Sequence, residues 1–336
     1  MKNGRIAGTG SYVPETIWKN EDLEKMVDTS DIWIRERTGI GARHIAGKET
    51  VAQMAVKAAR RALENAGICS TELDLILVGT SSSESIFPNT ACLVQDEIGA
   101  FRAACLDVSA ACTGFLAVYE LGQLYIRSGK AKNVLLIGAD ALSRLVDWSD
   151  RGTCILFGDG AAAAIIEYAP DALYTSHLGA DGTGAKYLYA HSALPRSPFV
   201  KAKREVECGD PDMQLAPQGW EYTMLQDGRE VYRFATHALE KAARLAAEKI
   251  GFDLNDLDKV VPHQANMRII ETAMKYLKQP MEKVIVNIDH HGNTSSASIP
   301  IALDEGIREG KIQRGDKVCL VGFGAGLTYA AIIMEY

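Results

Sequence analysis

The sequence predicts an α/β protein made of two similar halves, and three observations support this fold class. Long uncharged apolar runs are typical of strands in a sheet that is covered on both faces. Between these runs, apolar residues recur at helical spacing. Several segments of the first half also recur in the second half in the same order. We therefore expect two sheets back to back with two helices buried between them, in halves spanning residues 1–170 and 171–336.

Four pairs of similar segments define the duplication. The pairs are 62–79 with 246–263 and 133–138 with 317–322 at an offset of 184, 126–130 with 307–311 at an offset of 181, and 163–168 with 330–336. Their order and nearly constant offset make chance a poor explanation. Residues about 185–230 have no counterpart in the first half, and we interpret them as a polar, proline-containing insertion.

The first half is expected to run from helix to strand twice. Helical spacing predicts a helix at about 50–66, and the apolar run that follows predicts a strand over 73–79. A second apolar pattern of period 3.6 predicts a helix over 112–129, which ends near a glycine. Strands over 133–138 and 163–168 complete this half.

The second half repeats this plan. We expect a helix at about 233–250, a strand over 257–263, and helices over 264–278 and 296–310. The uncharged run 318–334 contains three glycines, so it predicts two buried strands around a turn rather than a membrane span.

Composition excludes several classes of protein. The chain has 336 residues, of which 47% are hydrophobic and 24% charged, a balance typical of globular proteins. Its formal net charge of −7 argues against an overall basic surface for nucleic acid. Seven cysteines without a CxxC pair indicate a reduced, cytoplasmic protein, and no secretory signal is visible.

Three reactive side chains are expected to meet where the two halves join. Cys112 stands at the start of the long helix of the first half, where helix amides would lower the pKa of its thiol. At the offset of 181, the equivalent position is Asn293, which precedes the buried helix of the second half. His263 follows a strand at its carboxyl end, where α/β sheets bind ligands. The alternatives are a surface histidine and a helix cap at Asn293 or Thr294.

With these residues placed, the chain resembles the β-ketoacyl-acyl-carrier-protein synthase III family of thiolase-like fold. The resemblance covers the whole chain except the insertion. The motifs that carry it are DIWIRERTGI (31–40), DVSAACTGF (107–115), DRGTCILFGDGA (150–161), PHQANMRII (262–270), HGNTSSASIP (291–300) and GFGAGLTY (322–329). The expected fold is therefore the duplicated, five-layered αβαβα arrangement.

The resemblance also implies roles for individual residues. Cys112 would be the nucleophile, with His263 and Asn293 completing the catalytic set, and the amides of Cys112 and Ala325 would form the oxyanion hole. Ala325 stands where the family usually has the middle glycine of a triplet. The other implied roles are a coenzyme A channel (Trp33, Arg37, Arg151, Asn266), an acyl pocket (Phe87 reaching into the partner subunit, and Phe323) and a carrier-protein docking surface (Arg233, Arg268, Lys275, Lys278).

The implied activity is a decarboxylating condensation of a short acyl-CoA with malonyl-acyl-carrier-protein, by a homodimer that initiates fatty acid synthesis. The alternatives are an acyltransferase of the same fold or a polyketide-type synthase of secondary metabolism, and for the docking residues an ordinary solvated face. We expect no cofactor, because released CO₂ generates the carbon nucleophile. We also expect no metal, since no carboxylate or cysteine stands near His290 and His291 at ligand spacing.

Overall fold

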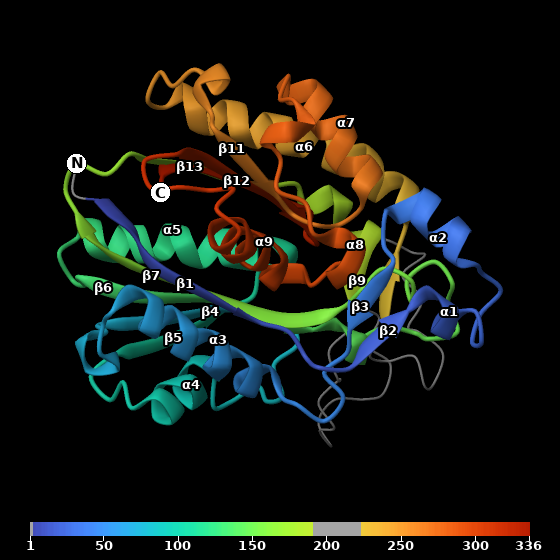
Figure 1. The fold of residues 1–336 in the computed structure, drawn as a ribbon, viewed down its shortest axis with the longest axis horizontal. Helices are drawn as coiled ribbons and strands as arrows, with labels where there is room; N and C mark the ends of the chain where they lie inside the picture. The colour runs from blue at the N-terminus through green and yellow to red at the C-terminus, as the bar shows by residue number, and fades with distance from the viewer. Residues whose placement is uncertain (1–2, 191–222) are drawn as a thin grey trace.

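A computed structural model describes residues 3–190 and 223–336, which form two sheets lying back to back (Figure 1). In spatial order, the first sheet contains β1 (Asn3–Tyr12), β7 (Asp159–Ala169), β6 (Asn133–Ala141), β4 (Leu75–Gly79) and β5 (Ala104–Val108). The second contains β11 (Lys259–Pro262), β12 (Lys317–Gly324), β13 (Thr328–Glu335) and β8 (Tyr174–Ala180).

Helices occupy three layers around the sheets (Figure 1). The first sheet carries α3 (Val51–Ala66) and α4 (Thr90–Ile98) on its outer face, and the second carries α6 (Gly228–Glu248) and α7 (Met267–Leu277). Between the sheets lie α5 (Gly114–Arg127) and α9 (Ser298–Arg308), whose apolar side chains share one core with both sheets. This five-layered αβαβα arrangement confirms the predicted architecture.

The two sheets repeat one topology. In the first, β4 runs parallel to β6, which is antiparallel to β7, which is antiparallel to β1. In the second, β11, β12, β13 and β8 follow the same pattern. The central strands β4, β6 and β12 are buried on both faces, β4 completely, which explains their continuous apolar runs. Among the described strands, β5 forms one edge of the first sheet and pairs with β4 alone.

The helix starts follow from local capping. In α3, Thr50 accepts a hydrogen bond from the Gln53 amide, and the Gln53 side chain returns one to Thr50, forming a capping box. The predicted start of α6 at residue 233 was wrong by five residues. The carboxylate of Asp227 caps this helix by accepting from the amides of Arg229 and Glu230.

The structure corrects the register of the duplication at the buried helices. The turns that precede α5 and α9 are short 3₁₀ helices, Ala111–Thr113 and Ser295–Ala297, which are related by 184 residues. Ala111 and Ser295, the first residues of these turns, both have positive φ, at 45° and 53°. The structural equivalent of Cys112 is therefore Ser296 rather than Asn293.

Smaller elements complete the described chain. They are β2 (Ile17–Lys19), α1 (Asn20–Leu23), α2 (Asp31–Thr38), β3 (Ala42–His44), β9 (Leu188–Ala190), β10 (Met224–Gln226) and α8 (Ile288–His291), together with short 3₁₀ turns. Most of the predicted insertion, residues 191–222, lies outside the described residues. Among the helices of the described ranges, none is long and apolar enough to cross a membrane.

Candidate active site

A cavity of about 930 Å³ lies where the halves meet, and Cys112, His263 and Asn293 all line it. Each side chain comes from a different loop at the end of a strand or the start of a helix. Phe323 and Ala325 line the same cavity from the end of β12. The fold therefore brings together the three reactive residues that the sequence singled out.

Cys112 sits in the 3₁₀ turn that leads into α5, so its side chain is held next to the amino end of a buried helix. Its sulfur accepts a hydrogen bond from the hydroxyl of Ser295 at 3.5 Å, which crosses from one half to the other. Ser295 belongs to the equivalent turn before α9. The two helix starts meet closely, since a Cβ on Gly114 would lie 3.0 Å from that of Ser296.

The prediction of an acidified thiol was wrong in sign. Burial raises the pKa of Cys112 to about 12, and the negative charge of Asp140 acts in the same direction. The hydrogen bond from Ser295 lowers this pKa but does not outweigh burial. At rest, Cys112 is therefore a thiol rather than a thiolate.

His263 directly follows β11 and is almost fully buried. Burial lowers the pKa of its imidazole to about 3, so the ring is neutral at physiological pH. Its Nδ1 lies 2.5 Å from the hydroxyl of Ser298, the first residue of α9. Ser298 Oγ also accepts a hydrogen bond from the Gln264 amide at 3.4 Å, which holds the hydroxyl oxygen beside the ring. A hydroxyl that donates to Nδ1 would keep the ring proton on Nε2.

Asn293 is fixed through both its backbone and its side chain. Its amide donates to the carbonyl of Leu156 at 2.9 Å, and its carbonyl accepts from Gly158 at 3.0 Å. The side-chain Oδ1 of Asn293 accepts a hydrogen bond from the backbone amide of Ser295 at 2.9 Å. This contact orients the side-chain amide, so that its Nδ2 can donate to another group. The helix-cap alternative was wrong, because the N-cap of α9 is Ala297 and the Thr294 side chain makes no capping hydrogen bond to the turn that follows it.

The turn after β12 passes very close to the nucleophile. A Cβ on Gly324 would lie 2.9 Å from the amide nitrogen of Cys112, so only glycine permits this approach. Ala325 follows immediately and lines the cavity. The methyl group of Ala325 is therefore accommodated here, although the synthase III resemblance places a glycine at this position.

Comparison with known proteins identifies the family. The model of 3-oxoacyl-[acyl-carrier-protein] synthase III matches residues 106–182, and the model of its C-terminal part matches residues 247–336. The beta-ketoacyl-[acyl-carrier-protein] synthase III of Clostridium novyi (strain NT) is 44% identical over 337 residues, covering 100% of both chains. This chain belongs to the synthase III family.

Solved structures agree with this assignment. The 3-oxoacyl-[acyl-carrier-protein] synthase III of Aquifex aeolicus VF5 superposes with a TM-score of 0.88 at 42% identity, over 99% of this chain and 100% of that one. The priming beta-ketosynthase of the R1128 polyketide pathway has the same TM-score at 35% identity, over 99% and 96%. The predicted family, thiolase-like fold and enzyme class, an acyltransferase that acts as a condensing enzyme, are thereby confirmed.

The residues that the synthase III resemblance assigns to a coenzyme A channel form one cluster. Arg37 and Asn266 line the cavity. The guanidinium carbons of Arg151 and Arg37 lie 4.9 and 5.8 Å from the centroid of the Trp33 ring. Asn266 caps α7 and donates to the carbonyl of Arg37 at 3.0 Å, which ties α7 to α2.

The two phenylalanines of the predicted acyl pocket have opposite environments. Phe323 is 3% exposed and packs edge to face against His263, with ring centroids 5.5 Å apart. Phe87 is 83% exposed and does not line the cavity of its own chain. Of these two residues, Phe323 alone lines the cavity of its own chain.

The predicted docking residues lie on α6 and α7. Arg268, Lys275 and Lys278 are all exposed on α7 or at its end. Arg268 also donates from Nε to the carbonyl of Glu36 at 2.9 Å. Arg233 forms an ion pair with Glu230 at 2.6 Å on α6, so its charge is partly balanced.

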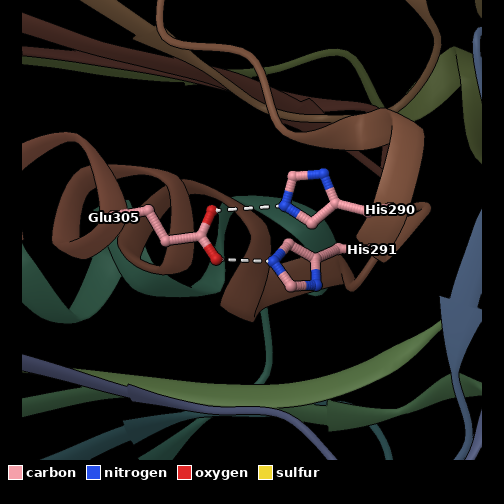
Figure 2. Close-up of side chains that lie close together, drawn as sticks. All are labelled: His290, His291 and Glu305. Carbon is pink, nitrogen blue, oxygen red and sulfur yellow. Dashed lines mark hydrogen bonds and ion pairs between the residues drawn. The ribbon is translucent and has the colours of Figure 1, made fainter. Parts of the chain in front are cut away.

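The fold places a carboxylate beside His290 and His291, which the sequence spacing did not indicate. Glu305 of α9 faces both histidines (Figure 2). Its oxygens lie 2.6 Å from His291 Nε2 and 3.8 Å from His290 Nε2. Sequence spacing could not show this, because a turn and a helix separate the partners.

Sequence reasoning also missed two serines. Ser295 contacts the sulfur of Cys112 and Ser298 contacts the ring of His263. The available signal was a run of hydroxyl residues, 294–296 and 298, at the start of an otherwise apolar helix. Such residues commonly cap helices, and here they also touch the reactive side chains.

Proposed function

We propose that this chain condenses a short acyl-CoA with malonyl-acyl-carrier-protein, releasing CO₂ and forming a β-ketoacyl-carrier protein, as the first condensation of fatty acid synthesis. The observation that carries the proposal is the convergence of a buried thiol, a neutral imidazole and an oriented amide on one cavity. The similarity to synthase III enzymes supports the same reaction class.

In the first half-reaction, Cys112 Sγ attacks the thioester carbonyl of the acyl-CoA. A C–S bond forms to the enzyme, the C–S bond to coenzyme A breaks, and the thiol proton leaves with the coenzyme A thiolate. The amides of Cys112 and Ala325 donate to the transient oxyanion, and a donor of this kind contributes about 3–4 kcal/mol. The close approach of Gly324 to Cys112 supports this pairing of amides.

In the second half-reaction, the malonyl carboxylate leaves as CO₂ and its bonding electrons form a thioester enolate. His263 Nε2–H and Asn293 Nδ2–H donate to the enolate oxygen as charge develops there. The enolate carbon attacks the acyl group on Cys112, a C–C bond forms, and the cysteine leaves and recovers a proton. Neutral donors suit this step, and neither a metal nor an organic cofactor takes part in it.

The substrate contacts follow from the same arrangement. Arg37, Asn266, Trp33 and Arg151 would hold the nucleotide of coenzyme A, since an indole face and guanidinium groups suit an adenine and its phosphates. Phe323 would limit the acyl group at the inner end of the cavity. The exposed basic side chains of α7, with Arg233 of α6, would receive the acidic carrier protein.

A homodimer accounts for the exposed edge of the first sheet. The strand β5 leaves one side unpaired, and large apolar side chains around it are exposed: Ile86, Phe87, Phe101 and Leu106. An unpaired edge with exposed apolar side chains favours pairing with a second chain. The cysteines of the described residues are all free, which supports action in the reducing cytoplasm.

Mass spectrometry of the intact protein tests the proposal. Mixing with acetyl-CoA should add one acyl group to the wild type and none to Cys112→Ala, while Cys92→Ser, which removes an exposed thiol, should still be acylated. His263→Ala and Asn293→Ala should retain acylation and lose CO₂ release from malonyl-carrier protein. Acylation at another cysteine, or CO₂ release that survives in both variants, would contradict the proposal.

A further inference from the structure

A second cluster of chemically reactive side chains lies behind the active site, away from the cavity. His290 and His291 come from α8, and Glu305 comes from α9 (Figure 2). None of the three lines the cavity. One ligand atom from each, the two imidazole nitrogens and a carboxylate oxygen, lie within 4.8 Å of one another.

The surroundings orient these groups toward one point. His290 Nδ1 lies 2.8 Å from a carboxylate oxygen of Asp289, which leaves Nε2 facing Glu305. Such a carboxylate behind the ring is the usual outer partner of a metal-binding histidine. Asn287 donates at 2.6 Å to Glu305 Oε2, the oxygen that also faces His290, and fixes the carboxylate plane.

Access and ligand type select the kind of ion. His291 is 95% buried, whereas the side chain of His290 is 52% exposed, so the cluster opens to solvent on one side. Two imidazoles and one carboxylate suit Zn²⁺ and similar divalent transition metals, with water as a fourth ligand. Without a metal, the imidazole N–H groups donate to the carboxylate of Glu305. A bound ion would displace these protons.

We propose that His290, His291 and Glu305 form a binding site for one divalent transition-metal ion of the Zn²⁺ class, oriented by Asp289. The ion would link α8 to α9 on the far side of the loop that carries Asn293. Because the ligands do not line the cavity, its role is to stabilise this loop. The inference does not rest on the proposed function.

Titration of the full chain with Co²⁺ tests the site, because four-coordinate Co²⁺ has intense visible bands. We expect one Co²⁺ per chain, displaced by Zn²⁺. Zn²⁺ should also raise the melting temperature of the wild type. His290→Gln should weaken Co²⁺ binding by at least about tenfold, and Asp289→Asn by about tenfold, the range found for outer partners.

Two controls separate this site from other metal-binding groups. His237→Gln removes an exposed histidine that stacks on Tyr276, 5.1 Å between centroids, and should bind Co²⁺ like the wild type. Cys69→Ser combined with Cys92→Ser removes the exposed thiols and should also leave binding unchanged. Absence of visible bands in the wild type, or equal binding by His290→Gln, would overturn the proposal.

Discussion

Replacing Ser298 by alanine should separate the two half-reactions of this enzyme. The Ser298 hydroxyl lies 2.5 Å from Nδ1 of His263, and both residues are almost fully buried. The Gln264 amide donates to the same hydroxyl oxygen and holds it in place. We expect the serine to donate to Nδ1, which would keep the ring proton on Nε2. Without the hydroxyl, the tautomer with its proton on Nδ1 is no longer disfavoured. In that tautomer, Nε2 presents a lone pair rather than a proton to the enolate oxygen.

The size of the effect follows from one buried hydrogen bond. Leaving a buried acceptor without its donor costs about 1–2 kcal/mol. Since about 1.4 kcal/mol corresponds to a factor of ten in rate, decarboxylation should fall about 5- to 30-fold. Acylation of Cys112 by acyl-CoA does not use the imidazole proton, so its rate should change less than about twofold.

The assay compares CO₂ release from malonyl-carrier protein with the rate of acylation followed by mass spectrometry. Ser295→Ala is the matched control, because Ser295 Oγ contacts Cys112 Sγ at 3.5 Å and should affect acylation more than decarboxylation. Ser298→Thr, which keeps the hydroxyl, should recover most of the lost rate. Equal losses of both half-reactions in Ser298→Ala, with no recovery in Ser298→Thr, would refute the positioning role.

Three further predictions concern the nucleophile, the dimer and the carrier protein. Burial raises the pKa of Cys112 to about 12, so its alkylation rate should rise about tenfold per pH unit from about pH 7 to 9. A plateau of the rate in that range would contradict a neutral resting thiol. Light scattering should detect a dimer, and Phe87→Ala should change acyl-chain preference; a fully active monomer would contradict both. Lys275→Glu should raise KM for malonyl-carrier protein about fivefold, and more at low salt, whereas Lys130→Glu, at the far end of α5, should not.

Much of the fold could be predicted because the duplication preserves the order of the elements, although their lengths differ between the halves, as in α3 with 16 residues and α6 with 21. In the buried helix pair, α5 has 14 residues and α9 has 11. The offset is therefore 184 at the helix starts and 181 at their ends, and the longer loop after α9 restores 184 at β12. Using the helix-end offset at a helix start gave the wrong equivalent of Cys112.

The candidate site was only partly predictable for a physical reason. Residue type and position indicated Cys112, His263 and Asn293, because strand ends and helix starts meet at one place in such folds. The pKa of Cys112 depends on burial by both halves, which no local pattern reveals. Likewise, Glu305 meets His291 only because α9 folds back along α8, so the spacing of these residues gave no signal.

The duplicated turns explain the position of Cys112 between the two halves. A Cβ on Gly138 would lie 2.2 Å from the carbonyl oxygen of Ser296, and one on Gly79 would lie 2.6 Å from the backbone of Gly114. These glycines allow the amino ends of α5 and α9 to meet, so two helix dipoles direct positive potential at one point. The first turn places Cys112 there, while the second places the serine hydroxyls that contact Cys112 and His263. The two copies of the turn therefore carry different side chains: one carries Cys112, and the other carries the hydroxyl groups that hold the side chains of Cys112 and His263.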